Sequence, residues 1–515
     1  MTTGKALDGK PYAGNPHVRF DEGEVAPCTE EASLRRVHCR RQPEGRASVC
    51  AATPRRGSLL YVTRRCFFGG AIAASAVAAG GTAASKGAKT VREDARDVRV
   101  AGDFDVVVAG GGPAGIAAAV TAARGGAKVA LLEAHGALGG IWTSGLLSCL
   151  IGVNNSDFDR EILERLGKYG AKLKRRPKNN DHSFIYEPEY MKLVCEEMCA
   201  EAGVRIRLHT AVAGAVRDAC GRNILAALTE SKSGREAWRA KVFVDCTGDG
   251  DLGALAGCGY DVGGDAPGDP EQPASLIAIV TIPDDRGILR CIANEPSNYD
   301  ADGKRICTST LKLLEEMNRV GISPSYGLPT MFRIHPHLYA FMCNHEYDVP
   351  VDDADAITEA TLRARKEVFG MVDALARKGG DAWRGLRLVT TAEQLGHRRA
   401  RRLHGRYTIT LADCLEGRQF EDGLCTCSFG LDVHAVSKAM NRIRPAGAPN
   451  GLRSRPYQIP LRACRAKDLD NLYMAGRCIS GEFLPQSSYR ITGTAVGMGV
   501  GVGKAACTLI PDFPG

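Results

Sequence analysis

The clearest chemical pattern in the chain is the glycine-rich run of residues 110–115, Gly-Gly-Gly-Pro-Ala-Gly. Gly110 permits a tight turn after a strand, Gly112 lets a pyrophosphate approach the backbone, and Gly115 allows a helix to pack closely on the strand. Pro113 and Ala114 would open that helix, whose first N–H groups and partial positive charge favour phosphate. The spacing therefore predicts a dinucleotide site that includes these five residues.

The flanking elements fit this prediction. Two short apolar runs, residues 105–109 and 128–133, predict parallel strands covered on both faces. Between them, the alanine-rich residues 114–124 predict a helix. Glu133 ends the second strand at the offset of about 20 residues that suits a ribose hydroxyl, and it would repel a 2′-phosphate. NADP is therefore disfavoured, whereas FAD, NAD and an ordinary glycine turn stay open.

Two later blocks repeat the pattern of a buried strand followed by a glycine turn. Residues 241–246 lead into Thr247, Gly248 and Asp249. Residues 471–475 lead into Gly476 and Arg477, and a helix is predicted from about residue 495 to 509. Such turns lie where parallel strands end, which is where ligands bind in α/β sheets.

The extended pattern resembles a known family. Gly139 and Gly140 follow Glu133 as in the FAD fingerprint of glutathione-reductase-like flavoproteins. Four blocks, residues 105–140, 244–257, 394–422 and 457–506, resemble the FAD-dependent oxidoreductase family related to the flavin subunit of heterodisulfide reductase. The resemblance spans nearly all of residues 103–510. It implies an α/β fold with a Rossmann-like, glutathione-reductase-type FAD domain and an inserted α+β substrate or cap domain.

The same resemblance assigns roles to several residues. Thr247, Gly248 and Asp249 would close over the cofactor from the side opposite the first glycines. Gly476, Arg477 and Thr492 would complete the cofactor site at the C-terminal strand and helix. The helix N-terminus would point at the flavin ring, near its N1 and C2 oxygen, where its dipole and Arg490 would stabilise the anionic reduced flavin. The alternatives are a plain strand-to-helix turn and a packed C-terminal helix.

Three residues are predicted to be catalytic: His434, Arg399 and Arg490. The strongly basic residues 391–410 resemble the family block that carries an arginine pair, and one or two arginines turned inward would hold an anionic substrate or a phosphate. A solvated basic helix face is the alternative. Asp432 and His434 resemble an Asp-x-His element of the family, so His434 is the first choice for acid–base chemistry.

Metal and disulfide chemistry find little support. The 19 cysteines form no CxxC pair and no closely spaced run that could hold an iron–sulfur cluster, so buried thiols are expected. His335 and His337 alternate on an expected strand, but no third ligand stands at metal spacing, and no metal site is predicted. The net charge of +8 comes mostly from the first 100 residues, so the body shows no general signal for nucleic acid.

The chain divides into five predicted segments. Residues 1–61 form a disordered extension or a misassigned start, and residues 62–100 hold a signal and linker. Residues 101–270 and 446–515 form the FAD-binding domain, and residues 271–445 form the cap. Arg64 and Arg65 precede a short run rich in Ala and Gly, which looks like a bacterial twin-arginine signal for periplasmic export. A basic pair before a linker, in a cytoplasmic protein without a stable membrane span, is the alternative.

These observations predict an FAD-dependent oxidoreductase that transfers a hydride between a small organic substrate and flavin N5. Residues 497–501 lie inside a helix and form no second dinucleotide fingerprint, so electrons would pass to an external acceptor or a redox partner protein. An electron-transfer subunit of a larger complex and a binding protein without a redox cycle are the rival hypotheses.

Overall fold

The computed structural model describes residues 91–510 apart from residues 154–155, 175–182, 266–270 and 445. The predicted extension (1–61) and the motif at Arg64 and Arg65 lie outside the described residues. In the described part, the α-helices are α1 (Pro113–Arg124), α2 (Asp157–Lys168), α3 (Pro188–Glu201), α4 (Asp251–Leu255), α5 (Ser309–Arg319), α6 (Ala354–Lys378), α7 (Leu411–Glu416), α8 (Lys438–Ile443), α9 (Phe483–Tyr489) and α10 (Thr492–Thr508). None of the described helices is long and apolar enough to cross a membrane.

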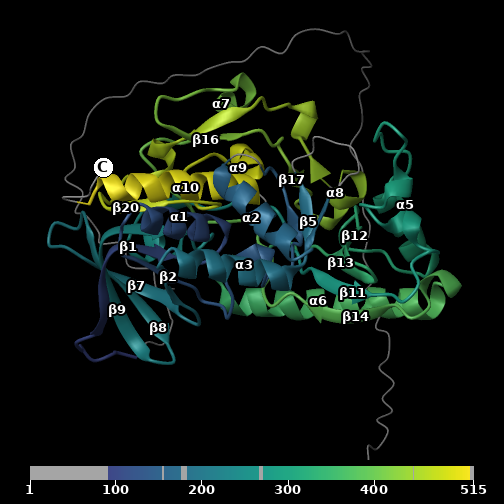
Figure 1. The fold of residues 1–515 in the computed structure, drawn as a ribbon, viewed down its shortest axis with the longest axis horizontal. Helices are drawn as coiled ribbons and strands as arrows, with labels where there is room; N and C mark the ends of the chain where they lie inside the picture. Colours follow the sequence, from purple (N-terminus) through teal and green to yellow (C-terminus); the bar gives the residue numbers. More distant parts are fainter. Residues whose placement is uncertain (1–90, 154–155, 175–182, 266–270, 445, 511–515) are drawn as a thin grey trace, which may run out of the picture. The chain divides into compact units, whose positions relative to one another are not determined.

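A seven-stranded sheet forms the first layer (Figure 1). Its strands, in spatial order, are β6 (Arg205–Arg207), β2 (Val129–Leu132), β1 (Arg99–Ala109), β9 (Gly234–Asp245), β8 (Ile224–Ser231) and β7 (Ala211–Arg217), with β20 (Leu472–Met474) also beside β9. The strands β6, β2, β1, β9 and β20 run parallel to one another. The strand β8 pairs antiparallel with β9, and β7 pairs antiparallel with β8. The last four residues of β1, Val106–Ala109, and all of β2 are apolar and buried, as expected where a parallel sheet is covered on both faces. The predicted hairpin around Gly234 is confirmed.

The helices α1 and α10 lie side by side against this sheet (Figure 1). Glycines of α10 permit the close contact, because a Cβ atom on Gly499 would stand 2.2 Å from the carbonyl oxygen of Ala114. A Cβ atom on Gly503 would likewise stand 2.6 Å from the carbonyl oxygen of Ala118. The helix predicted near the C-terminus, α10, thus packs directly against α1, the helix that follows the first glycine turn.

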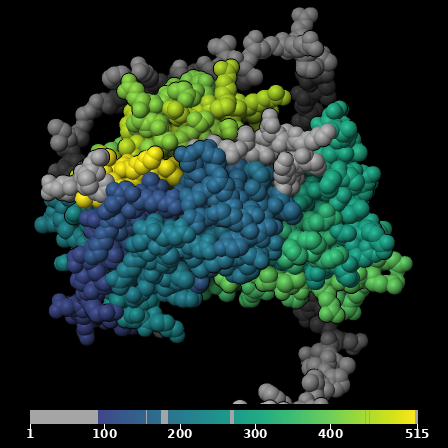
Figure 2. Space-filling view, in the orientation of Figure 1, coloured from purple at the N-terminus to yellow at the C-terminus, as the bar shows by residue number. Residues whose placement is uncertain are grey.

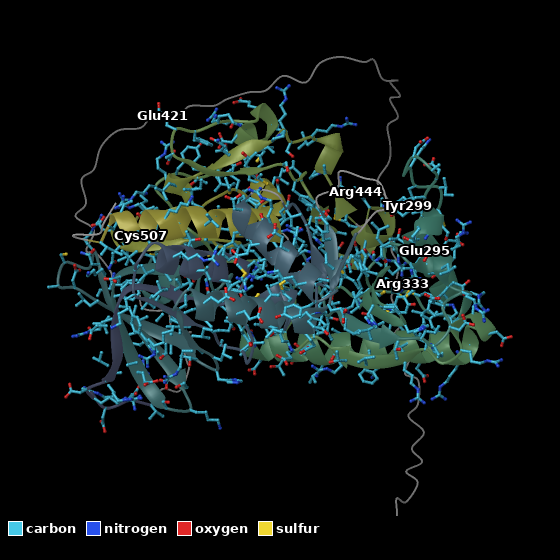
Figure 3. The ribbon with its side chains drawn as sticks, in the orientation of Figure 1. Glu295, Tyr299, Arg333, Glu421, Arg444 and Cys507 are labelled. Atoms are coloured by element: carbon cyan, nitrogen blue, oxygen red, sulfur yellow. The ribbon has the colours of Figure 1, made fainter. Side chains whose placement is uncertain are left out.

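The region predicted to be the cap contains a second sheet with a hydrophobic core of its own. Its strands, in spatial order, are β12 (Thr330–His335), β13 (Leu338–Met342), β11 (Ala278–Thr281) and β14 (Arg387–Thr391). They pair antiparallel, and with α5 and α6 they enclose a core that includes Val280, Phe341 and Trp383. Figure 2 shows the surface of this part of the chain, teal to green, on the right of the view. Figure 3 shows Arg333 beside Glu295 on the cap, and the two form an ion pair of 2.9 Å.

Small two- and three-stranded sheets complete the described chain. They pair β3 (Cys149–Leu150) with β5 (Phe184–Tyr186) and β5 with β4 (Lys172–Lys174), β10 (Tyr260–Asp261) with β15 (Arg402–Leu403), β16 (Gly423–Cys427) with β19 (Tyr457–Pro460), and β17 (Val433–His434) with β18 (Ala446–Gly447). Leu403, Ile409 and Cys427 pack in the core of the large sheet, although the predicted cap extends to residue 445. That boundary stays a prediction.

Two segments that flank the four-stranded sheet in the sequence pair with each other. The backbone N–H of Gly396 donates to the carbonyl oxygen of Ser275 at 2.8 Å. In return, the N–H of Ser275 donates to the carbonyl oxygen of Gly396 at 3.2 Å. The neighbouring Ala274 pairs in the same way with Glu346. We call residues 271–277 and 392–399 the two linkers.

Two local expectations have clear outcomes. The strand expected to carry both His335 and His337 ends at His335, and His337 lies in the following turn with φ of 65°, so their predicted common face is wrong. The described cysteines are free thiols and most are buried, as expected.

Two glycine substitutions in helices should have opposite effects on stability. Gly499→Ala should destabilise the fold by about 1–3 kcal/mol, because its Cβ would overlap the backbone of α1. Gly370→Ala in α6 meets no described atom within 4 Å, so it should stabilise by up to about 1 kcal/mol through helix propensity alone. Urea unfolding of both variants measures the two changes, and equal effects would contradict the close packing of α1 and α10.

Candidate functional site

Three glycine turns meet at the carboxyl edge of the parallel strands. In the sheet register, Asp245 at the end of β9 pairs with Ala109 of β1 on one side and with Met474 of β20 on the other. The turns after the three strands therefore lie together. Gly110, with φ of +95°, comes so close to the β9 turn that a Cβ atom there would stand 2.4 Å from the carbonyl oxygen of Cys246.

The first turn has the shape that a pyrophosphate requires. A Cβ atom on Gly115 would stand 1.8 Å from the carbonyl oxygen of Gly110, so this glycine fits helix against strand. At Gly112, by contrast, a Cβ atom would meet no described atom within 4 Å, which leaves open space above the backbone. Pro113 lies in the first turn of α1, directly after Gly112. Open space at a helix N-terminus is the expected cradle for phosphate groups.

The neighbouring glycine pair and the acid at the end of β2 support this turn. Gly139 and Gly140 both have positive φ, and a Cβ atom on Gly140 would stand 3.1 Å from the Cα of Gly112. The Oε2 of Glu133 accepts a hydrogen bond of 2.6 Å from the N–H of Gly111, and Oε1 accepts one of 2.8 Å from His135. The carboxylate is thus fixed against the turn, and its contact with a ribose stays a prediction.

Asp245 organises the second turn, and sequence reasoning missed its role. Its buried carboxylate accepts hydrogen bonds from the hydroxyl of Thr247 at 2.7 Å and from the N–H of Gly253 at 2.8 Å. Burial raises the pKa of Asp245, and these hydrogen bonds oppose the rise. The signal in the sequence was an acid at the end of an apolar strand, directly before the Thr-Gly-Asp turn.

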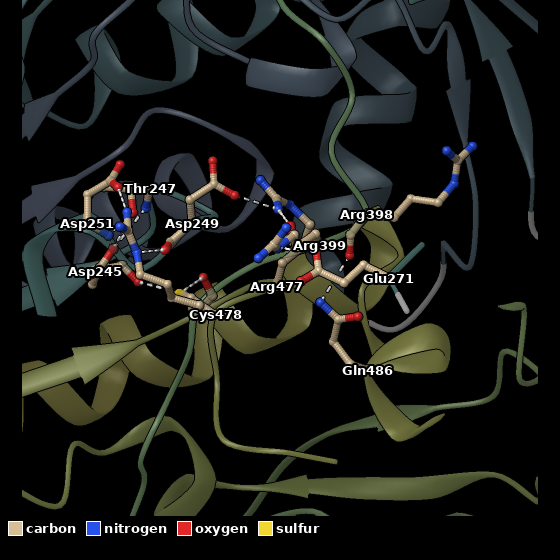
Figure 4. A network of polar contacts seen from close by, with 12 residues as sticks. Asp245, Thr247, Asp249, Asp251, Glu271, Arg398, Arg399, Arg477, Cys478 and Gln486 are labelled. Atoms are coloured by element: carbon tan, nitrogen blue, oxygen red, sulfur yellow. Dashed lines mark hydrogen bonds and ion pairs between the residues drawn. The ribbon is translucent and has the colours of Figure 1, made fainter. Parts of the chain in front are cut away.

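Arg477 joins the second and third turns (Figure 4). Its Nη1 donates to Oδ1 of Asp249 at 2.8 Å and also to the carbonyl oxygen of Arg399. Gly248, with φ of +82°, leaves room for the guanidinium, since a Cβ atom there would stand 2.5 Å from Nη2 of Arg477. Gly476 has φ of +102°, which permits the third turn.

The basic segment near residue 400 is no solvated helix face. The guanidinium of Arg399 forms an ion pair with Glu271, and Arg401 pairs with Asp251. Arg402 is buried and donates to the carbonyl oxygen of Gly481 at 2.8 Å. Figure 4 shows the side chain of Arg398 extending away from the Asp249 and Arg477 network. The arginines are therefore turned inward, and adjacent ones face different surroundings.

A second group of polar side chains surrounds His434. Its Nε2 lies 3.3 Å from Oδ2 of Asp432, and its Nδ1 lies 3.2 Å from Nε2 of His345. An ionised carboxylate only accepts hydrogen bonds, so Nε2 of His434 carries the proton and its Nδ1 accepts from His345. Nδ1 of His345 is then a bare acceptor, and it is buried without a partner among the described residues. The ring of Tyr326 packs on that of His345.

Burial and charge keep both histidines neutral. Burial, together with the positive charge of Arg398, lowers the pKa of His434 to about 3. The pKa of His345 is lowered by the same causes. Burial opposes ionisation of Asp432, but the hydrogen bond from His434 and the charges of Arg490 and Arg398 together hold its pKa below the usual range. The group thus holds an ionised acid, two neutral imidazoles and two arginines.

Arg490 and the start of α10 close this group. Nη2 of Arg490 donates to the carbonyl oxygen of Asp432 at 2.9 Å, and burial lowers its pKa to about 10, which leaves it charged near neutral pH. The buried hydroxyls of Thr492 and Thr494, in the first turn of α10, have no hydrogen-bond partner among the described residues. Unpaired hydroxyls beside a helix N-terminus fit a ligand with acceptor atoms, as the flavin ring has.

The structure thus separates the predicted catalytic residues into two places. His434 and Arg490 lie together around Asp432, whereas Arg399 belongs to the Arg477 network. The preceding residue, Arg398, instead acts through its charge on His434 and Arg490. The open cavity of about 690 Å³ between α1, α2 and α10 contains none of the predicted site residues.

Known proteins share this sequence pattern. The sequence model of the FAD dependent oxidoreductase family matches residues 105–512. A thiamine thiazole synthase from Methanothermobacter thermautotrophicus is 33% identical over 105 residues, which are 20% of this chain and 38% of the synthase. The chain therefore matches well under half the length of that curated relative.

Solved structures show weaker likeness. The p-nitrophenol 4-monooxygenase PnpA from Pseudomonas putida is 13% identical, with a TM-score of 0.41, and the match covers 80% of this chain and 81% of PnpA. A geranylgeranyl bacteriochlorophyll reductase-like protein from Thermoplasma acidophilum is 12% identical, with a TM-score of 0.38, and covers 79% and 78%.

Substitution of two glycines separates folding from cofactor binding. Gly112→Ala should leave the fold intact but weaken FAD binding by at least about tenfold, because its methyl group would occupy the open space above the turn. Gly115→Ala should instead lower the stability of the protein itself, since its methyl group would overlap the backbone at Gly110. Thermal unfolding and titration of the apoprotein with FAD measure both effects. Full FAD affinity in Gly112→Ala would contradict the assigned cradle.

Acid should destabilise the protein through its buried histidines. The unfolded chain takes up a proton at His434 below pH 6.5, whereas the folded protein does so only near pH 3. The neutral histidine therefore contributes its full free energy of unfolding above pH 6.5. This contribution decreases as the pH falls from 6.5 towards 3, by up to about 1.4 kcal/mol per pH unit for each such histidine. Urea unfolding at several pH values should show a shallower dependence for His434→Asn. His404→Asn, which removes an imidazole whose side chain is 43% exposed, is the control.

Proposed function

The chain belongs to the FAD-dependent oxidoreductase family, and from this premise we propose that it transfers a hydride between a small organic substrate and flavin N5. FAD is its cofactor. The observation that carries the proposal is the hydrogen-bonded chain of Asp432, His434 and His345 beside Arg490, which directly precedes α10. This chain places proton-handling groups next to the helix whose N-terminus is expected to face the flavin ring.

The glycine turns and Glu133 would hold the adenine dinucleotide, while Thr492 and the N-terminus of α10 would lie at the flavin end. When bound, FAD supplies the two-electron acceptor. The protein contributes positioning and electrostatics. The positive charges of Arg490 and of the helix N-terminus favour electron transfer to the cofactor, since negative charge then accumulates near them.

Oxidation of an alcohol or amine carbon also releases a proton from the heteroatom. Asp432 is 33% exposed, whereas both ring nitrogens of His434 are engaged by its neighbours, so Asp432 is the group that a substrate can reach. A protonated carbonyl product is a strong acid, so even a carboxylate of low pKa accepts the proton released by an alcohol, whereas an amine can leave as its iminium ion and keep its proton. His434 then acts as a positioning residue that orients the carboxylate and shares the proton.

The first test is the absorbance spectrum of the purified protein, followed by anaerobic mixing with a panel of small hydroxy and amino compounds. We expect a flavin spectrum that bleaches with at least one member of the panel. Reduction only by another redox protein would overturn the proposal in favour of an electron-transfer subunit. A colourless protein that fails to bind added FAD would overturn it in favour of a binding protein.

Asp432→Asn should slow substrate-driven flavin reduction by about 10²–10⁴, the range for removal of a positioned proton acceptor. Asp261→Asn is a matched control, because Asp261 also lies 3.3 Å from a histidine, His404, but does so on the surface. The control should keep the parental rate. Stopped-flow absorbance measures both variants, and an unchanged rate in Asp432→Asn would remove this acid from the mechanism.

A further inference from the structure

Two hydrogen-bond donors near His434 have no acceptor among the described residues. Nε2 of Gln272 and Nε of Arg490 are buried and find no partner among the described residues. The side chain of Gln272 is nearly covered, with 5% of the residue exposed. Buried donors without acceptors are costly, at about 1–3 kcal/mol each, so a group of them indicates a ligand that supplies acceptor oxygens.

The orientation of Gln272 is fixed by its neighbours. Its Oε1 accepts hydrogen bonds from the backbone N–H of His434 at 3.1 Å and from Nη2 of Arg490 at 3.4 Å. Because both neighbours are donors, the amide oxygen must face them. The amide NH₂ of Gln272 therefore remains available to a ligand. Arg398 lies close by, because it donates a hydrogen bond of 2.7 Å to the carbonyl oxygen of the adjacent residue, Pro273.

Arg398 is the arginine in this region that lacks an acid. Its Nη1 donates to Pro273 and to the hydroxyl of Ser275 at 2.9 Å, and no described carboxylate forms an ion pair with it. The nearby Arg399 and Arg401 each have a carboxylate partner. Burial lowers the pKa of Arg398. A half-buried arginine without a carboxylate partner is costly to the fold, and an incoming anion relieves that cost.

The charges around Arg398 sum to one excess positive charge. Arg398 and Arg490 are cations, and Asp432 is the single ionised acid that acts on both. His434 and His345 are neutral, and burial raises the pKa values of Tyr326 and Tyr347 to about 12. A monoanion would balance the group, whereas a phosphate, with about −1.5 to −2 charges at pH 7, would overcompensate it.

We propose that the substrate is a small monocarboxylate whose carboxylate group is bound by Arg398, Gln272 and Arg490. The proposal rests on the proposed function only in calling this ligand the substrate. The planar guanidinium of Arg398 matches the two oxygens of a carboxylate, and the amide of Gln272 donates to one of them. Asp432, which lies 3.6 Å from Arg490, then faces the part of the ligand that carries the reactive hydroxyl or amine.

The experiment measures binding, independently of turnover. The flavin-loaded protein is titrated with acetate, glycolate, glycolamide and inorganic phosphate, and both the flavin spectrum and the unfolding temperature are followed. We expect acetate and glycolate to bind, glycolamide to bind at least about tenfold more weakly because it lacks the charge, and phosphate to bind more weakly than glycolate.

Arg398→Gln should weaken glycolate binding by at least about tenfold and leave FAD content unchanged. Arg377→Gln makes the same change of charge on the exposed face of α6 and is the matched control, which should bind as the parent does. If Arg398→Gln fails to fold, Arg398→Lys keeps the charge but loses the planar fork, and it should still weaken glycolate binding. Equal glycolate affinity in the parent and in the Arg398 variant would overturn the proposal.

The outcomes separate the carboxylate site from the redox function. Carboxylate binding that depends on Arg398, without reduction of the flavin by any compound, would sustain the site and overturn the proposed oxidoreductase activity. Reduction by neutral alcohols, without carboxylate binding, would sustain the activity and overturn the site. Tighter binding of phosphate than of glycolate would also overturn the carboxylate, and would assign a phosphorylated substrate instead.

Discussion

The close approach of two backbone turns is the constraint on which the rest of the structure depends. Gly110 lies so near to Cys246 that no side chain fits between the turn after β1 and the turn after β9. The parallel register of β1, β9 and β20 brings the ends of the three strands to one edge. Asp245, which is buried between them, then fixes the second turn by hydrogen bonds to Thr247. A cofactor cradle follows from strand register and glycine packing, before any side chain touches the ligand.

The group around His434 follows a different principle. The cradle is held by satisfied backbone contacts, whereas this group keeps donors without acceptors and an arginine, Arg398, without a counter-ion. A fold tolerates such features where they serve binding, because the penalty is relieved when the ligand arrives. The neutral state of His345 and His434 adds to this selectivity, since protonated histidines would raise the positive charge and favour a dianion.

The sequence predicted the strand, glycine turn and helix around residues 110–115, and it predicted only part of the group around His434. Residues 110–115 and Glu133 are close in the chain, and their spacing reflects the strand and the helix that join them. His345 reaches its place through the fold of the cap, and no local pattern marks it. The predicted catalytic residue Arg399 pairs with Glu271, whereas the charge of Arg398 acts on His434. Residues 397–401 form no helix or strand, so no regular period in the sequence says which of these arginines faces which group.

The paired linkers have a consequence for movement of the cap. Gln272 lies on the linker that enters the cap and Arg398 on the one that leaves it, and backbone hydrogen bonds between Ser275 and Gly396 tie the two linkers together. A hinge at these segments would therefore pass through the residues that grip the ligand. Any displacement at these linkers would change the spacing between Gln272 and Arg398, so the proposed carboxylate binding would depend on the position of the four-stranded sheet that the linkers flank.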